Sequence, residues 1–417
     1  MDVRGHAQPC ELELTKVSDK GPRRLWAATR DKNVLETRAG PVGRPPKVTP
    51  KSFPDDASAA RAFDKAVRAK LRSGYAFVRD PSDASRGDIV TVAFASGGGG
   101  GPILDLSVDG KLALTAGCKG APVAVWLETI ETTSGKRRRI FDKSVAAGRQ
   151  IFLHSACFDR TGQAVILLLG KETLRLDLVS GKLEPIAKYV EFQTARFNPF
   201  LLHPHFDRAR ERLVVFDKRS LVRVLDSGGN QLFEVSMEHP TTECRAAQLS
   251  PSGKLLALVR VSRGIVYNHD DAKHDATNAV DVWDVDTGKR RDTIELETPV
   301  DQVGIDSTDR LLTMSWQYAQ GPVIHDLRMY QELHRFTDPW RTDRLATAYG
   351  WDWSPDGSLL AVGREGLSVY AAEDIANITD VPVESSGEFR VKRVVFSGDG
   401  TLLGTYEGGL FVLRSMR

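Results

Sequence analysis

One pattern recurs along the chain from about residue 87 onward, and it restricts the fold more than any other feature. Each copy has an apolar strand with strict alternation, a tight turn, a second strand, a gap and a third strand. The clearest copy covers residues 246–294, where AAQLSPSGKLLALV precedes AVDVWDVDTGKRRDTI. Such alternation is typical of half-buried β-strands. The turns SPSG, SPDG, SGDG and SVDG place glycine where a positive φ is favoured.

The copies are spaced as the blades of a β-propeller would be. Successive turn anchors lie 43–56 residues apart, and a four-stranded blade needs about 40–50 residues. The seven copies therefore predict a mainly β protein that contains a seven-bladed β-propeller. The anchors are Gly110, Gly162, about Ala209, Gly253, Asp309, Gly357 and Gly400.

The ring is predicted to close by pairing its two ends. The last copy stops after its third strand, at Arg417, while residues 88–95 (DIVTVAFA) form a strand that belongs to no copy. Because a three-stranded blade would leave an open edge, we expect residues 88–95 to be its fourth strand. Gly97–Gly101 then form a flexible joint. A phosphate loop is not indicated, since neither a helix nor Gly-Lys-Ser/Thr follows.

The fourth copy resembles the WD-repeat family most closely. Val282-Trp283-Asp284, followed by Asp286-Thr287-Gly288, looks like the WD dipeptide and the turn after it. The other copies keep the spacing without the dipeptide, and the resemblance covers about 330 residues. It implies the propeller fold and leaves the function open, because many unrelated functions share one fold.

The N-terminal part does not follow the repeat. We predict a small α+β module over residues 1–80 and the propeller over residues 81–417. ELELTKVS, RRLWAATR and VLETRAG, between residues 11 and 40, are typical of short strands. A helix is predicted next, with Asp55 or Asp56 as its N-cap and Gly74 at its end. Its amphipathic stripe is Ala60, Phe63, Val67 and Leu71.

This module resembles the WGR domain, which is known from DNA-dependent poly(ADP-ribose) polymerases and from many bacterial proteins. The matching features are Trp26 in an early strand, the strand at 34–38, the glycine motif at 39–44 and the helix end at 70–75. Where the family has Trp-Gly-Arg, this chain has Ala39-Gly40-Pro41. In the polymerases that Trp and Arg help grip a DNA end by stacking and by phosphate contact. The resemblance therefore implies the module's fold without that grip.

Charge is distributed unevenly, although the net charge is only +2. Residues 1–80 hold 17 Lys and Arg against 10 Asp and Glu, and the remainder holds 40 against 45. Weak, salt-sensitive nucleic-acid binding through the module is therefore one hypothesis. A solvated basic face, or charge complementarity between the two parts, is the alternative. The candidate residues, which make the loop after the third strand basic, are Arg38, Arg44, Lys47 and Lys51.

The cysteines and the hydropathy favour a cytoplasmic protein. Cys10, Cys118, Cys157 and Cys244 are scattered and form no CxxC pair, so neither a disulfide framework nor a zinc knuckle is indicated. No segment approaches the roughly 18 apolar residues that span a bilayer. The N-terminal residues lack the apolar core of a signal peptide. We expect a reducing compartment and no membrane association.

No catalytic constellation stands out. The chain has no GxSxG nucleophile elbow. His154 and Cys157 are three apart in a predicted strand, which places them on opposite faces. The insertion at residues 268–278 (NHDDAKHDATN) offers possible ligands, but its spacing matches neither a zinc finger nor an EF-hand. We expect no cofactor, no metal and no enzyme; the alternative is a propeller enzyme with an unrecognised site.

Large side chains in loops give a better functional signal. Residues 316–318 (WQY) lie between the second and third strands of blade five, and residues 339–341 (PWR) link blades five and six. In a propeller, both loop types and the 268–278 insertion open on one face. Trp, Tyr and Arg dominate binding hot spots, although packing between blades is an alternative for the tryptophans. We predict a non-catalytic scaffold that binds a protein partner through Trp316, Tyr318, Trp340, Arg341, His269 and His274.

Overall fold

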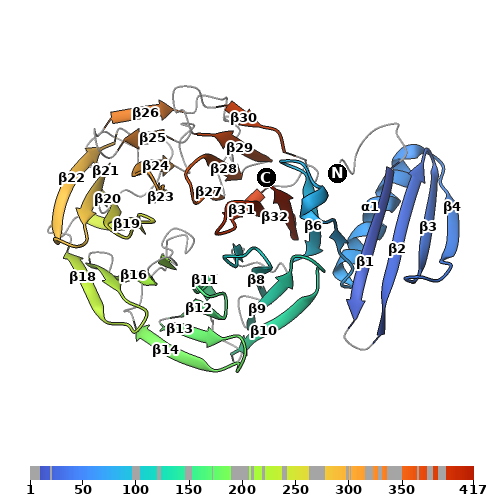
Figure 1. Ribbon diagram of the computed structural model, residues 1–417, viewed down its shortest axis with the longest axis horizontal. Coiled ribbons are helices and arrows are strands. Elements are labelled where there is room, and N and C mark those ends of the chain that lie inside the picture. Colours follow the sequence, from blue (N-terminus) through green and yellow to red (C-terminus); the bar gives the residue numbers. More distant parts are fainter. Residues whose placement is uncertain are drawn as a thin grey trace.

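The computed structural model is mainly β, with one α-helix among the residues that it describes. Most of its small antiparallel sheets are arranged in a ring, and one sheet lies beside the ring together with the helix (Figure 1). The described residues are 10–18, 21–95, 104–119, 124–145, 153–170, 172–188, 206–207, 211–217, 221–236, 242–262, 278–296, 300, 302–314, 323–326, 331–335, 350–363, 366–372, 379–383 and 391–417.

The N-terminal sheet has the strand order β1-β2-β3-β4. Its strands are β1 (Cys10–Ser18), β2 (Gly21–Asp31), β3 (Val34–Pro41) and β4 (Lys47–Ser52). The first three lie where the sequence predicted strands. β4 corrects the expectation of a basic loop at these residues. It lies at the edge of the sheet with all six residues exposed, so it lacks the apolar alternation that marks a half-buried strand.

Helix α1 (Asp56–Arg72) packs on one face of this sheet. Asp55 is its N-cap, and the carboxylate accepts a hydrogen bond from the N–H of Ser58 at 2.6 Å. Gly74 follows the helix with a φ of +89°, a conformation that glycine adopts without strain. The buried residues are Ala59, Phe63, Val67 and Leu71. Ala59, rather than the expected Ala60, is the fully buried alanine of the stripe.

The ring consists of sheets formed by successive stretches of the chain (Figure 1). The first two hold β7 (Leu104–Leu106), β8 (Leu112–Lys119), β9 (Ala124–Glu131) and β10 (Arg137–Ser144), then β11 (Leu153–Phe158), β12 (Ala164–Leu169), β13 (Glu172–Asp177) and β14 (Leu183–Lys188). The next two hold β15 (Phe206–Asp207), β16 (Arg212–Asp217), β17 (Leu221–Leu225) and β18 (Gln231–Ser236), then β19 (Thr242–Leu249), β20 (Leu255–Ser262), β21 (Asn278–Asp284) and β22 (Lys289–Glu295). Two more hold β23 (Gln302–Ile305), β24 (Arg310–Met314), β25 (Val323–Asp326) and β26 (Gln331–Arg335), then β27 (Gly350–Trp353), β28 (Leu359–Gly363), β29 (Leu367–Ala371) and β30 (Thr379–Val381).

A five-stranded sheet joins the two ends of the ring. Its order is β31-β32-β33-β6-β5, with β31 (Val391–Phe396), β32 (Leu402–Glu407), β33 (Leu410–Ser415), β6 (Ile89–Phe94) and β5 (Phe77–Val78). β6 pairs antiparallel with β33, from Phe94 opposite Leu410 to Ile89 opposite Arg414. β6 thus lies where the sequence placed the closing strand. The fifth strand, β5, has only two residues and was not expected; a 3-10 turn, η1 (Pro81–Asp83), connects it to β6.

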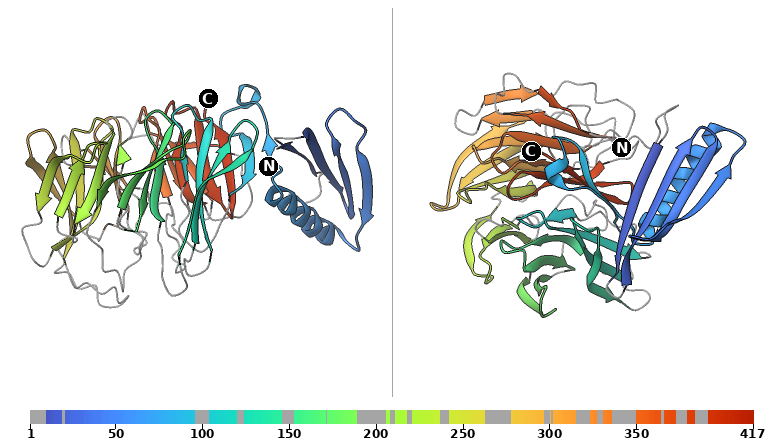
Figure 2. Two further views of the ribbon diagram at one scale, coloured as in Figure 1. Left: turned by 90° about the horizontal axis from the view of Figure 1, so that it is seen from below. Right: turned by 45° about the vertical axis from the view of Figure 1, so that its right-hand side comes forward.

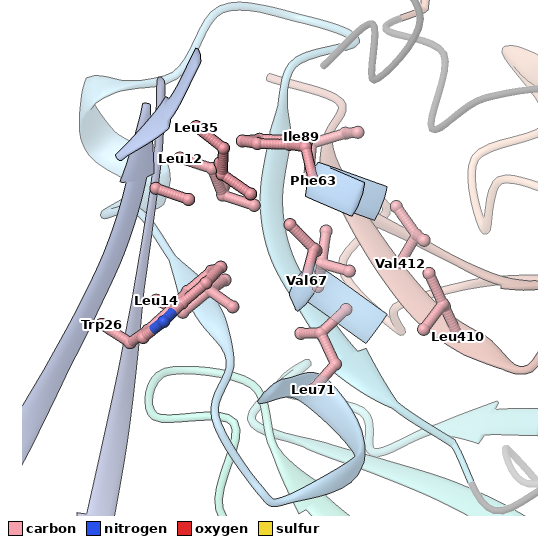
Figure 3. Close-up of a cluster of buried hydrophobic side chains, with 12 residues drawn as sticks. Leu12, Leu14, Trp26, Leu35, Phe63, Val67, Leu71, Ile89, Leu410 and Val412 are labelled. Atoms are coloured by element: carbon pink, nitrogen blue, oxygen red, sulfur yellow. The ribbon is translucent and has the colours of Figure 1, made fainter. Parts of the chain in front are cut away.

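The module and the closing sheet share one hydrophobic core. Side chains from β1, β2, β3 and α1 meet side chains from β6 and β33 (Figure 3). Both views in Figure 2 show the module against this side of the ring. The module therefore covers the strand that closes the ring. The buried members of the cluster are Leu12, Leu14, Trp26, Ala28, Leu35, Phe63, Val67, Leu71, Ile89, Val92, Leu410 and Val412.

A second contact joins the module to the first sheet of the ring. Ala76 is 1% exposed and packs in a cluster with residues of β6, β7, β8 and β9. A Cβ added at Gly135, in the turn between β9 and β10, would lie 2.0 Å from the Ala76 side chain. Gly135 therefore leaves room for the module. Arg137 of β10 donates to the backbone carbonyl of Arg72, at the end of α1, at 3.3 Å.

Candidate functional site

The two ends of the ring differ in their connections. Antiparallel neighbours alternate in direction, so first-to-second and third-to-fourth strand turns share one end, which we call the turn face. Second-to-third connections and links between sheets leave at the other end, which we call the connection face. First-to-second turns take four or five residues. The longest stretches of sequence between described strands, 189–205, 263–277 and 336–349, follow strand ends that lie at the connection face.

In the described turns of the turn face, the hydrogen-bonding groups are largely satisfied within the turns themselves. At the first turn, the Ser107 hydroxyl accepts from the N–H of Leu112 at 2.9 Å and donates to Asp109 at 2.8 Å. Ser354 and Ser397 repeat this arrangement. In the third-to-fourth turns, the backbone N–H and hydroxyl of Ser180 lower the pKa of Asp177. Polar groups that are already paired in this way have little to offer a partner.

The turn geometry agrees with six of the seven sequence anchors, and the seventh lies outside the described residues. The residues at the expected positions have positive φ, and they are Gly110, Gly162, Gly253, Asp309, Gly357 and Gly400. The remaining anchor, placed at about Ala209, falls at residues 208–210, outside the described residues. The described residue with positive φ in that turn is Glu211, at +53°.

The predicted partner-binding residues are not among those that the structure describes. They are Trp316, Tyr318, Trp340, Arg341, His269 and His274. The strand ends that flank them are described. Val261 of β20 pairs with Asn278 of β21, and Thr313 of β24 pairs with Val323 of β25. These terminal pairs belong to neighbouring sheets and lie at the connection face.

Two aromatic residues on the inner strand β27 hold neighbouring sheets together. Trp353 is 7% exposed, and the guanidinium of Arg310 lies 4.9 Å from its ring centre. Trp351 is half-buried. A Cβ added at Gly304 of β23 would lie 1.6 Å from the Trp351 ring, so only glycine leaves space for it. Trp351 and Trp353 therefore pack between sheets, whereas Trp316 and Trp340, for which such packing was the alternative, lie outside the described residues.

Arg310 forms the most extensive polar contact between sheets in the described part of the chain. Its Nε forms an ion pair with the buried Asp306 at 2.5 Å. Its Nη atoms donate to the backbone carbonyls of Gly357 and Ala372 in the next sheet. Arg212 makes a simpler contact of the same kind. It donates one hydrogen bond to the backbone carbonyl of Gly253, in the next sheet, at 2.7 Å. The sequence marks both arginines, because each follows the positive-φ residue of its turn.

Two aspartates make a second kind of contact between sheets, which the sequence analysis missed. Asp105 accepts from the N–H of Phe158 at 2.7 Å, and Asp352 accepts from the N–H of Phe396 at 2.8 Å. Each acceptor lies in one sheet and each donor in the next. The sequence does contain a signal for these two contacts: each aspartate stands two residues before the serine of its turn, in DLSVDG and DWSPDG.

The buried arginine of the closing sheet, Arg414, is paired with buried residues of the same sheet. Arg414 is 1% exposed and donates to Glu407 at 2.7 Å and to Thr405 at 2.9 Å. Both partners are also buried. A buried charge is tolerated when it is paired and hydrogen-bonded, so this cluster supports the sheet. Among the described residues, no group of three His, Cys, Asp or Glu could hold a metal ion.

Cys157 lies on β11 as a free, half-buried thiol. Burial, and then the nearby charge of Asp159, raises its pKa to about 12. The thiol is therefore protonated at neutral pH, whereas the thiolate is the form that attacks electrophiles or binds metals. His154 lies on the same strand.

The four basic candidates of the module do not form a single surface. Arg38 pairs with Glu11 at 2.6 Å and with Glu36 at 3.5 Å. Residues opposite each other in an antiparallel pair share a face. Lys47 lies opposite Ala39, so it is on the face of the sheet away from Arg38. Lys51 is on the same face as Lys47, and Arg44 is exposed in the turn before β4.

Comparison with known proteins gives a likeness in fold. No family model matches the chain, and no curated protein matches it. Among solved structures, it is similar to a chain in "Crystal Structure of Mitotic Checkpoint Complex", with a TM-score of 0.53 and 14% identity. The match covers 78% of this chain and 93% of the other. At that identity the likeness concerns the fold alone, and it fits a β-propeller.

No helix among the described residues is long and apolar enough to cross a membrane.

Proposed function

We propose that this chain is a non-catalytic interaction protein that binds a protein partner through the connection face. In this proposal residues 81–417 form a seven-bladed, WD-repeat-like β-propeller and residues 1–80 a WGR-like module. The succession of antiparallel sheets around the ring, with β6 completing the last one, supports the blade count. A sheet with a helix on one face supports the module. The free thiols of Cys157 and Cys244 are compatible with a cytoplasmic location.

The contrast between the two faces carries the proposal. The described turns of the turn face are short, and their polar groups are largely paired internally. At the connection face the described strands are separated by longer stretches of sequence, including 263–277, 315–322 and 336–349. Long connections held by a rigid scaffold are where binding residues concentrate. The aromatic and arginine residues within these segments are of the types that dominate protein interfaces.

Nucleic-acid binding through the basic candidates of the module, Arg38, Arg44, Lys47 and Lys51, has less support. Arg38 is engaged by two glutamates. Lys47 and Lys51 lie on the other face of the sheet, at an exposed edge strand that also contains Pro50. Lysine and proline at an edge strand commonly prevent pairing with other chains. A protective role therefore accounts for these lysines without a ligand.

Replacing Trp340 and Tyr318 together by alanine is expected to weaken partner capture while leaving the fold intact. Loss of two interface aromatics typically weakens binding by 2 kcal/mol or more, about thirtyfold. Capture by the intact protein and by the variant would be compared at equal concentration, after their melting temperatures have been matched. The control replaces Lys254 and Lys289, both exposed on the turn face. Unfolding of the double variant would assign these residues to packing, and unchanged capture would move the partner site elsewhere.

A further inference from the structure

The turn between β33 and β6 is assembled from two distant parts of the chain. In the first ring sheet, the carbonyl of Glu131 accepts from the N–H of Gly135 at 2.7 Å and so closes the third-to-fourth turn. In the closing sheet, the carbonyl of Ser415 accepts in the same way from the N–H of Gly87 at 2.7 Å. The N–H of Ser415 also donates to the carbonyl of Asp88 at 3.0 Å. This turn is therefore complete in its hydrogen bonds, although no short covalent segment joins its two strands.

Gly87 has the backbone conformation of a turn glycine. Its φ is +88°, and the glycines at this place in the first two ring sheets, Gly135 and Gly181, have φ of +66° and +71°. Met416 donates to the Thr401 carbonyl at 2.8 Å, as the residue after the third strand does in both of those sheets. A covalent turn keeps two separated strands close, whereas strands joined only through a long chain gain much more freedom. The pairing between β33 and β6, which we call the seam, lacks that restraint.

The module covers the outer edge of the seam. β5 pairs with β6, with Phe77 opposite Val92. Just before β5, Ala76 exchanges two backbone hydrogen bonds with Thr15 of β1, both at 2.8 Å. The sheet of the module is thus joined through backbone groups to the outer side of β6. In the described part of the ring, the outer strands of the other sheets pair on one side only.

The segment that links the module to β6 holds the turn itself. The carboxylate of Asp88 accepts from Arg79 at 3.2 Å and from the N–H of Ser85 at 2.9 Å. Arg86 donates to the carbonyl of Met416 at 3.3 Å. These contacts fix residues on both sides of the interrupted turn, and each involves a residue that enters the ring directly from the module.

The turn glycine also fits tightly against the neighbouring sheet. A Cβ added at Gly87 would collide with the carbonyl oxygen of Pro382, which follows β30 of the sixth sheet. Gly229, the turn glycine of the third sheet, lies in the same way against the Ile186 carbonyl of the second sheet. The interrupted turn therefore keeps the packing of a covalent one.

We propose that the module is a clasp for the ring: the ring opens at the seam, and the module holds the seam shut. Phe63 and Val67 of α1 share a core with Ile89 of β6 and Val412 of β33 (Figure 3). When the module detaches, this core meets water and β6 loses its outer neighbour, while the other ring sheets keep their covalent turns. Detachment thus switches the ring from closed to open and frees the edges of β33 and β6. This switch does not depend on the partner proposed for the connection face.

Hydrogen exchange of the unaltered, full-length protein at low urea gives the first test. We expect β6 and β33 to exchange together with the strands of the module, and before β20 and β21 on the far side of the ring, because opening is local. Exchange of β6 and β33 in step with every other ring strand would overturn the proposal, since the ring would then open as one unit.

Gly87→Ala tests the seam directly, with Gly181→Ala as its control. Both glycines have positive φ and hold the same place in their turns, so alanine adds similar backbone strain. An added Cβ meets no atom within 4 Å at Gly181, whereas at Gly87 it collides with Pro382. We expect Gly87→Ala to accelerate exchange in β6 and β33 about tenfold or more, with β20 and β21 unchanged. An effect no larger than that of Gly181→Ala on β13 and β14 would contradict the clasp.

A second set of variants displaces the module without altering the seam, and it decides the matter if Gly87→Ala fails to fold. A Cβ added at Gly135 would collide with the side chain of Ala76, beside β5. Gly135→Ala should therefore accelerate exchange in β6 and β33, and Ala76→Gly in the same chain should lower it again by removing the obstructing methyl group. Ala76→Gly alone is the control for the lost methyl group. If the second change brings no recovery, the acceleration comes from backbone strain at Gly135, and the clasp is refuted.

Discussion

Replacing Phe63 by alanine is expected to lower the free energy of unfolding by about 3–5 kcal/mol, as truncation of a buried phenylalanine does. Phe63 is 1% exposed and lies in α1, yet its core includes Ile89 of β6 and Val412 of β33. The loss should therefore reach the closing sheet. Amide hydrogen exchange in β6 and β33 should accelerate, although β33 is more than 300 residues away in sequence.

The control for this prediction is Phe158→Ala. Phe158 is 0% exposed and lies in β11, in a core cluster that contains no module residue. It should cost a similar amount of stability, with faster exchange centred on the second sheet. If Phe63→Ala instead gave a separate early transition, with β6 and β33 fully protected, the module and the ring would unfold independently.

Arg310→Ala is expected to have a comparable effect on the ring itself, again about 3–5 kcal/mol. The change removes the contacts to the Gly357 and Ala372 carbonyls and leaves the carboxylate of Asp306, 1% exposed, without its cation. Urea unfolding would measure the loss. Arg223→Ala is the matched control, because its ion pair with Glu234 is 2.7 Å long but is about one-third exposed on both sides. It should cost at most about 1 kcal/mol.

A second variant separates charge loss from loss of packing. In the neighbouring sheet, Ser250 and Leu255 occupy the places of Asp306 and Arg310: the N–H of Ser250 donates to the Leu255 carbonyl as that of Asp306 donates to the Arg310 carbonyl, and no buried ion pair is present. The double change Asp306→Ser with Arg310→Leu copies that pair. It should recover much of the stability that Arg310→Ala loses. If it recovers nothing, the contacts to the next sheet matter more than the unpaired carboxylate.

The repeats carried most of the information about the ring. Alternating strands and turn glycines are local features, so they could be recognised in the sequence. The closing strand at 88–95 could be placed because the last copy lacked a fourth strand. Strands without a periodic hydrophobic pattern were harder to predict from the sequence. β5 has only two residues, and β4 is exposed throughout, so neither carries a hydrophobic pattern.

The contacts between elements were less accessible from the sequence than the elements themselves. Trp26 was assigned to the module, and nothing local indicated that its core would include β33. Arg38 could be identified as basic, but its neutralisation by Glu11 depends on strand pairing.

The most direct test of the interaction proposal is a footprint of the captured complex. Hydrogen exchange of the protein, free and bound to its partner, would be compared over both faces of the ring. We predict protection at the connection face, in the segments that follow β20, β24 and β26, with no change at the turns around Ser107, Ser250 and Ser354. Protection centred on those turns, or the absence of any partner that protects the connection face, would contradict the account.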